Sequence, residues 1–194
     1  MFVQILGKSY GINIVVLNLS YNQLTTLPES ITNLDNLNTL SLNNNQLQVI
    51  PESIGRLVEL QYLNLSSNRL QVLPESIGNL VNLTHLYLSV NQLQVLPESI
   101  GRLLNLTELY LGSNLLTILP ASILNIKNSL QIYTCSYEIN NLLADTEFLI
   151  FRCLDEELTN LPTGLKEIWI RERKENKNLN HKLPFGCVIK YYKN

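Results

Sequence analysis

The chain has 194 residues, of which 14 are basic and 16 acidic, and its formal net charge is −2. This length can bury a substantial core in a single domain, and the nearly balanced charge argues against binding nucleic acid or another polyanion. The three cysteines are widely spaced and odd in number, so they do not form the pattern of a disulfide framework. We therefore expect a reducing, intracellular setting, the cytoplasm.

Residues 1–13 come before the repeats and are expected to cap their N-terminal end. They contain Lys8 and no long apolar run, so we expect neither a secretory signal nor a membrane contact. Gly7-Lys8-Ser9 resembles the end of a phosphate-binding loop, but Phe2 stands where that loop requires a glycine. We expect no nucleotide and no other cofactor.

Residues 14–128 consist of five tandem copies of one 23-residue pattern, L-x-x-L-x-L-x-x-N-x-L-x-x-[LI]-P-x-x-I-x-x-[LI]. The copies begin at Ile14, Leu37, Leu60, Leu83 and Leu106. A fixed period of this length is typical of a solenoid, in which each repeat buries its apolar side against its neighbours. The pattern resembles the leucine-rich repeat family, and its Leu-Pro-x-x-Ile segment is similar to the intracellular type found in Ras-suppressor and erbin-like proteins. The resemblance implies an α/β solenoid, an arc with a parallel β-sheet on the concave face and short helical or 3-10 turns on the convex face.

Each copy should begin with a short strand whose fourth and sixth residues point into the core, such as Leu63 and Leu65 in the third copy. An asparagine follows each strand, where its amide can both donate to and accept from buried backbone groups. The resemblance implies that these asparagines form a stacked structural ladder. They are Asn22, Asn45, Asn68, Asn91 and Asn114.

The outer segment of each copy is nearly constant. Four copies carry Pro-Glu-Ser-Ile, with the prolines at Pro28, Pro51, Pro74 and Pro97. Proline suits the first position of a short helical turn, and a glutamate next to it is favourable near the positive end of the peptide dipoles. The exposed strand positions differ between copies instead. We interpret this contrast as a fixed scaffold with a varied recognition surface, although drift on a solvated surface would look similar.

The large exposed side chains of the strands converge in the third, fourth and fifth copies. The predicted partner-binding residues are Tyr62, Asn64, His85, Tyr87, Glu108 and Tyr110. Tyrosine is enriched at the centres of interfaces because its rigid ring buries a large area while its hydroxyl keeps a polar partner. The alternative is that these rings only cover the parallel sheet, which exposed tyrosines also do.

Residues 129–170 read as degenerate, shortened repeats. In Leu130-x-x-Tyr133-x-Cys135 we expect Tyr133 at the inward fourth position of a strand, and Phe151 has the same place in Phe148-x-x-Phe151-x-Cys153. Leu165-x-x-Ile168-x-Ile170 predicts a further strand. Residues 171–194 are expected to form a charged loop and a C-terminal cap. The shortened repeat and the Lys-Leu-Pro-Phe-Gly-Cys segment resemble the ends of repeat proteins of large DNA viruses of amoebae, which would imply a place in the host cytoplasm and a host signalling protein as partner.

The sequence does not predict an enzyme or a metal site. The two histidines are His85 and His181, and no cysteine pair has zinc spacing. His85 and Glu108 can meet on neighbouring strands, but no nucleophile or oxyanion site can be placed beside them. We therefore expect a non-catalytic module that binds a protein partner on the concave strand face. The alternative is a structural or assembly element that packs through an end of the solenoid. The sequence does not indicate the oligomeric state.

Overall fold

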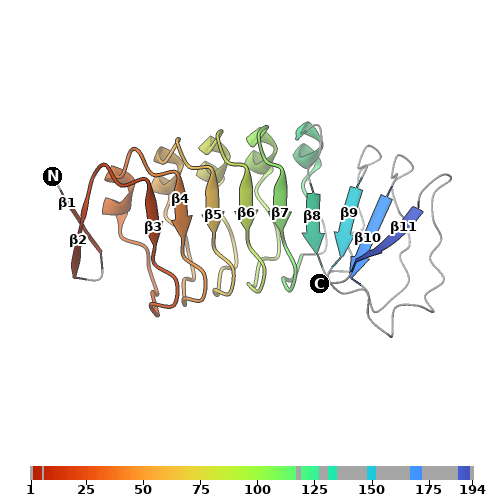
Figure 1. Ribbon diagram of the computed structural model, residues 1–194, viewed down its shortest axis with the longest axis horizontal. Coiled ribbons are helices and arrows are strands. Elements are labelled where there is room, and N and C mark those ends of the chain that lie inside the picture. The colour runs from red at the N-terminus through yellow and green to blue at the C-terminus, as the bar shows by residue number, and fades with distance from the viewer. Residues whose placement is uncertain are drawn as a thin grey trace.

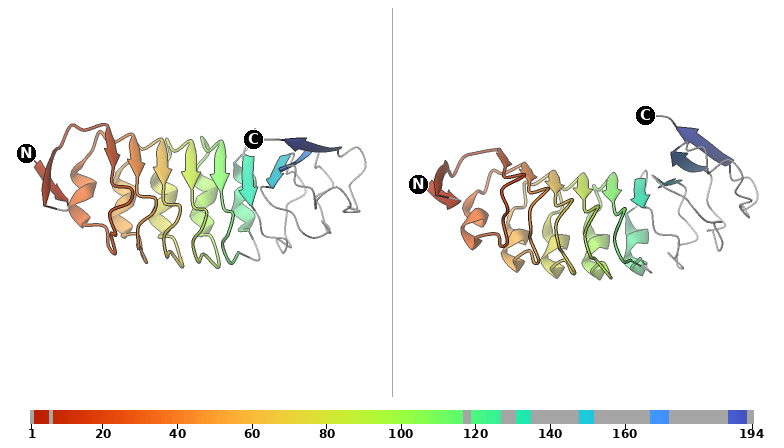
Figure 2. Two further views of the ribbon diagram at one scale, coloured as in Figure 1. Left: turned by 60° about the horizontal axis from the view of Figure 1, so that its bottom comes forward. Right: turned by 90° about the horizontal axis from the view of Figure 1, so that it is seen from below.

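The computed structural model describes residues 2–5, 7–116, 119–126, 131–134, 148–151, 167–171 and 188–192. Figure 1 shows the strands side by side along the long axis of the molecule, and Figure 2 shows the helices on the opposite side from the sheet. An antiparallel hairpin of β1 (Phe2–Ile5) and β2 (Lys8–Gly11) stands at the N-terminal end. The α/β solenoid with a parallel sheet and short 3-10 turns, predicted from the repeats, is confirmed.

One parallel sheet contains all the remaining strands in sequence order. Its members are β3 (Val16–Asn18), β4 (Thr39–Ser41), β5 (Tyr62–Asn64), β6 (His85–Tyr87), β7 (Glu108–Tyr110), β8 (Gln131–Thr134), β9 (Phe148–Phe151), β10 (Glu167–Arg171) and β11 (Val188–Tyr192). From β3 to β7, each residue pairs with the residue 23 positions later, as with Leu40 and Leu63. The inward residues Leu63 and Leu65 are fully buried, because each lies between the leucines of two neighbouring repeats.

The asparagines after the strands join neighbouring repeats through buried hydrogen bonds. The Asn68 amide nitrogen donates to the carbonyls of Leu42 and Leu65, both at 3.0 Å. Its oxygen accepts from the backbone N–H of Leu47, also at 3.0 Å. Asn45, Asn91 and Asn114 make the equivalent contacts. Asn22, in the first repeat, is exposed, and its amide nitrogen donates to the Ser20 carbonyl.

Short 3-10 helices form the convex side. They are η1 (Glu29–Asn33), η2 (Glu52–Arg56), η3 (Glu75–Asn79), η4 (Glu98–Arg102) and η5 (Ala121–Asn125). The proline before each helix occupies the N-cap, so each helix begins one residue later than the sequence predicted. Two features between these helices were not predicted, and both tie one repeat to the next.

The first feature is a glutamate that reaches into the following repeat. The Glu52 carboxylate accepts from the backbone N–H of Ser76 at 3.1 Å, and Glu75 accepts from Ser99 in the same way at 3.2 Å. The carboxylate therefore caps the next helix, whereas the sequence predicted a favourable place at the start of its own helix.

The second feature is a glycine where neighbouring helices approach closely. A Cβ on Gly101 would lie 2.2 Å from the backbone oxygen of Ser122, and a Cβ on Gly55 would lie 2.6 Å from that of Ser76. Because the clashing atom belongs to the backbone, a side chain at these positions would force the helices apart. Thr32 occupies the equivalent position in the first repeat.

The strands after residue 128 correct part of the predicted register. Ile132 pairs in line with Leu109, and Tyr133 pairs in line with Tyr110, so the 23-residue offset continues into β8. Ile132, and not Tyr133, is therefore in line with the fourth position of the preceding repeat, so the predicted register was wrong by one residue. In β9 it is Leu149, two residues before Phe151, that pairs in line with Ile132. The predicted strand around Ile168 is confirmed as β10, and β11 pairs with it in parallel.

Other predictions for this part of the chain lie outside the described residues. Among these is the charged loop after Arg171. No helix in the described part of the chain is long and apolar enough to cross a membrane.

Candidate functional site

The exposed side of β5, β6 and β7 brings the predicted partner-binding residues together. Parallel pairing places Tyr62 opposite His85 and His85 opposite Glu108 in one column. Asn64, Tyr87 and Tyr110 form the second column in the same way. All six side chains are partly exposed, since alternate residues of a strand point away from the buried leucines. We call Tyr62, His85, Tyr87, Glu108 and Tyr110 the concave cluster.

The aromatic rings of the concave cluster form one continuous surface across three strands. Tyr87 and Tyr110 are stacked, with ring centroids 4.4 Å apart and planes at 12°. Tyr62 lies tilted against Tyr87 at 5.1 Å. The His85 ring is 6.1 Å from that of Tyr62 and nearly parallel to that of Tyr87. Small residues border this surface at the ends of the strands, namely Ser66, Ser89 and Gly112.

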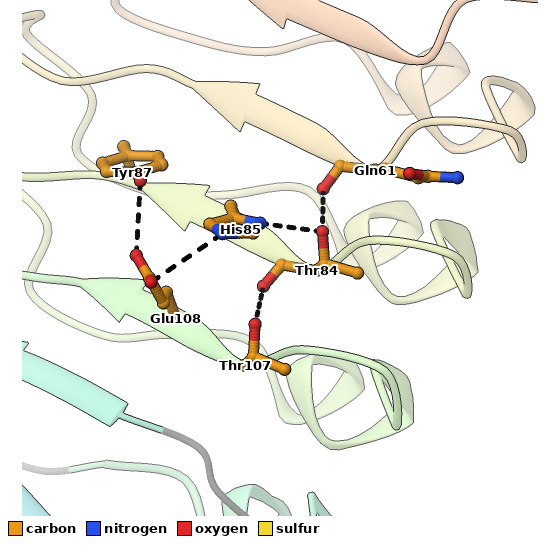
Figure 3. Close-up of polar contacts among 6 residues, drawn as sticks. All are labelled: Gln61, Thr84, His85, Tyr87, Thr107 and Glu108. Carbon is orange, nitrogen blue, oxygen red and sulfur yellow. Dashed lines mark hydrogen bonds and ion pairs between the residues drawn. The ribbon is translucent and has the colours of Figure 1, made fainter.

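Glu108 is the polar centre of the concave cluster (Figure 3). Its Oε2 accepts from the Tyr87 hydroxyl at 3.3 Å, and its Oε1 lies 3.8 Å from Nε2 of His85. Burial raises the pKa of Tyr87 to about 12, and the negative charge of Glu108 adds to the effect. The Tyr87 hydroxyl therefore keeps its proton near neutral pH and remains a donor to the carboxylate.

Thr84 orients the His85 ring from the neighbouring position on the strand. Its Oγ1 lies 2.8 Å from Nδ1 of His85 and 2.9 Å from the carbonyl oxygen of Gln61. A Thr84 hydroxyl that donates to the Gln61 carbonyl can accept from an N–H at Nδ1 of His85, and one that donates to Nδ1 uses that nitrogen as an acceptor. In both arrangements Thr84 contacts Nδ1, and Nε2 of the ring faces Glu108.

Asn64 is held within its own strand. Its amide oxygen accepts from the backbone N–H of Ser66 at 3.0 Å, and its nitrogen donates to the Tyr62 hydroxyl at 3.4 Å.

The sequence did not predict Thr84 and Gln61 as supports of the cluster. The available signal was a threonine just before His85, because a threonine hydroxyl at this position can reach the carbonyl of the preceding strand. Thr107 makes the same contact with the carbonyl of Thr84 at 3.0 Å.

The concave cluster offers polar and aromatic contacts but no assembled metal site. Within the residues that the structure describes, no group of three or more histidine, cysteine, aspartate or glutamate side chains could hold a metal ion. His85 and Glu108 are a single pair. Chemically, the arrangement can stack on a partner, accept hydrogen bonds through a carboxylate, and donate them through a tyrosine hydroxyl.

Comparisons with solved structures place the chain among known repeat proteins. It is similar to a leucine-rich repeat protein of Leptospira interrogans, with 27% identity, a TM-score of 0.59, and coverage of 92% of this chain and 68% of that chain. It is also similar to the leucine-rich repeat ectodomain of the receptor kinase SOBIR1 from Arabidopsis thaliana, with 30% identity, a TM-score of 0.54, and coverage of 61% and 67%. A third similar structure is internalin C2 from Listeria monocytogenes, with 25% identity, a TM-score of 0.55, and coverage of 63% and 52%.

Family models agree with these structural similarities, although no curated protein matches the chain significantly. The model described as "Leucine Rich Repeat" matches residues 13–34 and 36–57. The model described as "Leucine-rich repeat region" matches residues 52–183, which is more than half of the chain. The chain therefore belongs to the leucine-rich repeat family.

Proposed function

We propose that the chain is a non-catalytic module that binds a protein partner on its concave strand face. Leucine-rich repeat proteins commonly act as protein–protein interaction modules. The binding surface consists of the concave cluster together with Asn64. The observation that carries this proposal is the continuous surface of three partly exposed tyrosine rings across β5, β6 and β7.

The chemistry of this surface suits a protein partner better than sheet cover alone. Tyrosine rings are enriched at interface centres and lose little conformational freedom on binding. Cross-strand ring pairs would also stabilise the sheet. Sheet cover alone, however, does not require a partly exposed carboxylate beside the rings, and Glu108 is 29% exposed.

Photo-crosslinking in the source cells tests the proposed face. A benzophenone amino acid replaces Ser89, a small residue at the border of the concave cluster, and in a matched variant it replaces the exposed Val72, which lies outside the strands. We expect a discrete protein adduct from the Ser89 variant and none from the Val72 variant. The proposal fails if both variants give the same adducts, or if only the Val72 variant gives one.

A second candidate function is end-to-end assembly, and the edge of the sheet favours it. β3 is the first strand in the sheet order, and Val15 and Val16 are 52% and 64% exposed beside that edge. An exposed edge strand with apolar neighbours is a surface on which another chain can pair. Light scattering over a range of concentrations separates the two functions. Dimers that Val16→Lys abolishes would support assembly, and a monomer at every concentration would contradict it.

The setting and the kind of partner are parts of the same proposal. We propose an intracellular, cytoplasmic protein with a signalling protein as partner and no nucleic-acid or membrane contact. The odd cysteine count and the net charge of −2 support this. The erbin-like subtype and a viral source, with a host protein as partner, stay predictions from the sequence.

A further inference from the structure

We propose that the concave cluster recognises an arginine side chain of the protein partner, with Glu108 as its ionic contact and the tyrosine rings as its stacking surface. This inference rests on the proposed function and adds the chemical identity of the group that is bound. Three properties of the cluster support it: its charge, the remaining capacity of the carboxylate to accept hydrogen bonds, and the aromatic surface beside that carboxylate.

The only formal charge at the exposed positions of the first five strands of the sheet is negative. Across β3 to β7, the exposed positions carry one carboxylate, Glu108, and no lysine or arginine. The basic residues whose side chains the structure describes lie elsewhere, and they are Lys8, Arg56, Arg69 and Arg102. A partner that docks against these strands therefore finds negative charge at one place, which is complementary to a cation.

Glu108 still has capacity to accept hydrogen bonds. An ionised carboxylate accepts about four hydrogen bonds, and strong bonds from a cation are about 2.7–2.9 Å long. The Tyr87 hydroxyl contact at 3.3 Å and the His85 contact at 3.8 Å are both longer than this. The carboxylate is also partly exposed, so a cation can reach it without displacing a short, buried bond.

The rings beside Glu108 select the shape of that cation. A cation is attracted to the face of an aromatic ring within about 6 Å of the ring centroid. Tyr87 donates its hydroxyl to Glu108, so the carboxylate lies at the edge of the tyrosine stack that Tyr87 and Tyr110 form. The guanidinium of arginine is planar, stacks on rings and binds carboxylates through two N–H groups, whereas the lysine ammonium is a compact, strongly hydrated charge. Arginine therefore satisfies both parts of the surface.

Titration with short capped peptides, followed by NMR of the tyrosine and histidine side chains, tests this inference. The peptides are Gly-Gly-Xaa-Gly-Gly, with arginine, lysine or the neutral arginine analogue citrulline as Xaa. The protein variants are Glu108→Gln and the matched control Glu59→Gln, which removes the same charge from an exposed position outside the strands. Circular dichroism verifies that both variants are folded.

We expect saturable binding of the arginine peptide, with shifts at Tyr62, His85, Tyr87 and Tyr110. Citrulline as Xaa and Glu108→Gln should each weaken binding about fivefold, the upper range for a partly exposed ion pair. Glu59→Gln should leave binding unchanged, and lysine should bind more weakly than arginine.

Four results would overturn the inference: no saturable binding of the arginine peptide, equal affinity for arginine and citrulline, equal affinity for arginine and lysine, or the same loss in both glutamate variants. These failures are distinguishable from failure of the proposed function. If the crosslinked protein partner depends on the concave cluster while the peptides show no preference for arginine, only the arginine inference is wrong.

Discussion

Tyr87 is the residue of the concave cluster that contacts both the neighbouring aromatic rings and the charged carboxylate. It contacts two tyrosine rings and donates its hydroxyl to Glu108. Because burial and the nearby carboxylate both disfavour the phenolate, its pKa is raised from 10.0 to about 12. The folded chain therefore holds this proton over a pH range in which the unfolded chain loses it.

The raised pKa predicts how stability changes at high pH. The contribution of Tyr87 should be fully present below a pH of about 10 and should be lost as the pH rises towards about 12. A tyrosine absorbance titration of the wild type against Tyr87→Phe measures this ionisation. Glu108→Gln should shift the pKa of Tyr87 only part of the way back, because burial is the larger cause. Ionisation of Tyr87 near its ordinary pKa in the wild type would contradict this description of the cluster.

Asn68 makes hydrogen bonds to backbone groups, which an apolar side chain could not make. Asn68→Ala would leave the carbonyl oxygens of Leu42 and Leu65 and the N–H of Leu47 without these bonds, so we expect unfolding to become easier by about 1–3 kcal/mol. Denaturant unfolding measures this loss. Asn22→Ala, at the exposed start of the ladder, is the control and should have a much smaller effect. Equal effects of the two substitutions would show that Asn68 is solvated.

Val90 is in a backbone conformation that β-branched residues rarely adopt. Its φ is 59°, in the left-handed region, and its side chain is 53% exposed. Asn44 occupies the same position in the second repeat with a φ of 56°. Val90→Asn should therefore stabilise the fold by about 1 kcal/mol, because asparagine tolerates this conformation. Val95→Asn is the control, because Val95 is similarly exposed and has no positive φ. It should raise the denaturation midpoint much less than Val90→Asn does. A lower midpoint for Val90→Asn would contradict the strain at this position.

The 3-10 helices of neighbouring repeats contact one another as closely as the strands do. Glu52, Glu75 and Glu98 each accept from a backbone N–H of the next helix, and the glycines allow neighbouring helices to approach each other's backbone closely. The convex side is therefore constrained by specific contacts between repeats, and its nearly constant sequence follows from these contacts.

Gly101→Ala tests the close approach of η4 and η5. The new Cβ would lie 2.2 Å from the Ser122 carbonyl oxygen, so one helix must move, and we expect a loss of about 1–3 kcal/mol. Gly11→Ala is the control, because no atom lies within 4 Å of its Cβ position. Thermal unfolding of both variants measures the difference. If Gly101→Ala is as stable as Gly11→Ala, the helices are not packed as described.

For the whole molecule, a strict period makes most of the fold predictable from the sequence. The 23-residue offset gives the strand pairing from β3 to β7 and brings together the six residues of the proposed binding surface. The reach of Glu52 to Ser76 could not be predicted, because it depends on the distance between helices and not on spacing within a repeat. The predicted register of β8 was wrong because both Leu130 and Ile132 fit an apolar pattern in the sequence. Only the pairing with β7 decides which frame the strand adopts.

A solenoid of this kind presents one long face, so the position of a binding site along it is decided by side chains and not by shape. In the first two repeats the exposed strand positions hold no aromatic or charged residue; they are Val16, Asn18, Thr39 and Ser41. The next three strands hold the tyrosines, the histidine and the glutamate. We therefore propose that a protein partner binds over these three strands.

The most direct test is calorimetric titration of the partner captured by crosslinking. Tyr87→Ala/Tyr110→Ala removes two stacked rings and should weaken binding by at least about 2 kcal/mol, or about thirtyfold. Tyr21→Ala removes an exposed tyrosine outside the cluster and should bind with wild-type affinity. Wild-type affinity for the folded Tyr87→Ala/Tyr110→Ala variant would contradict the claim that the concave cluster is the binding site.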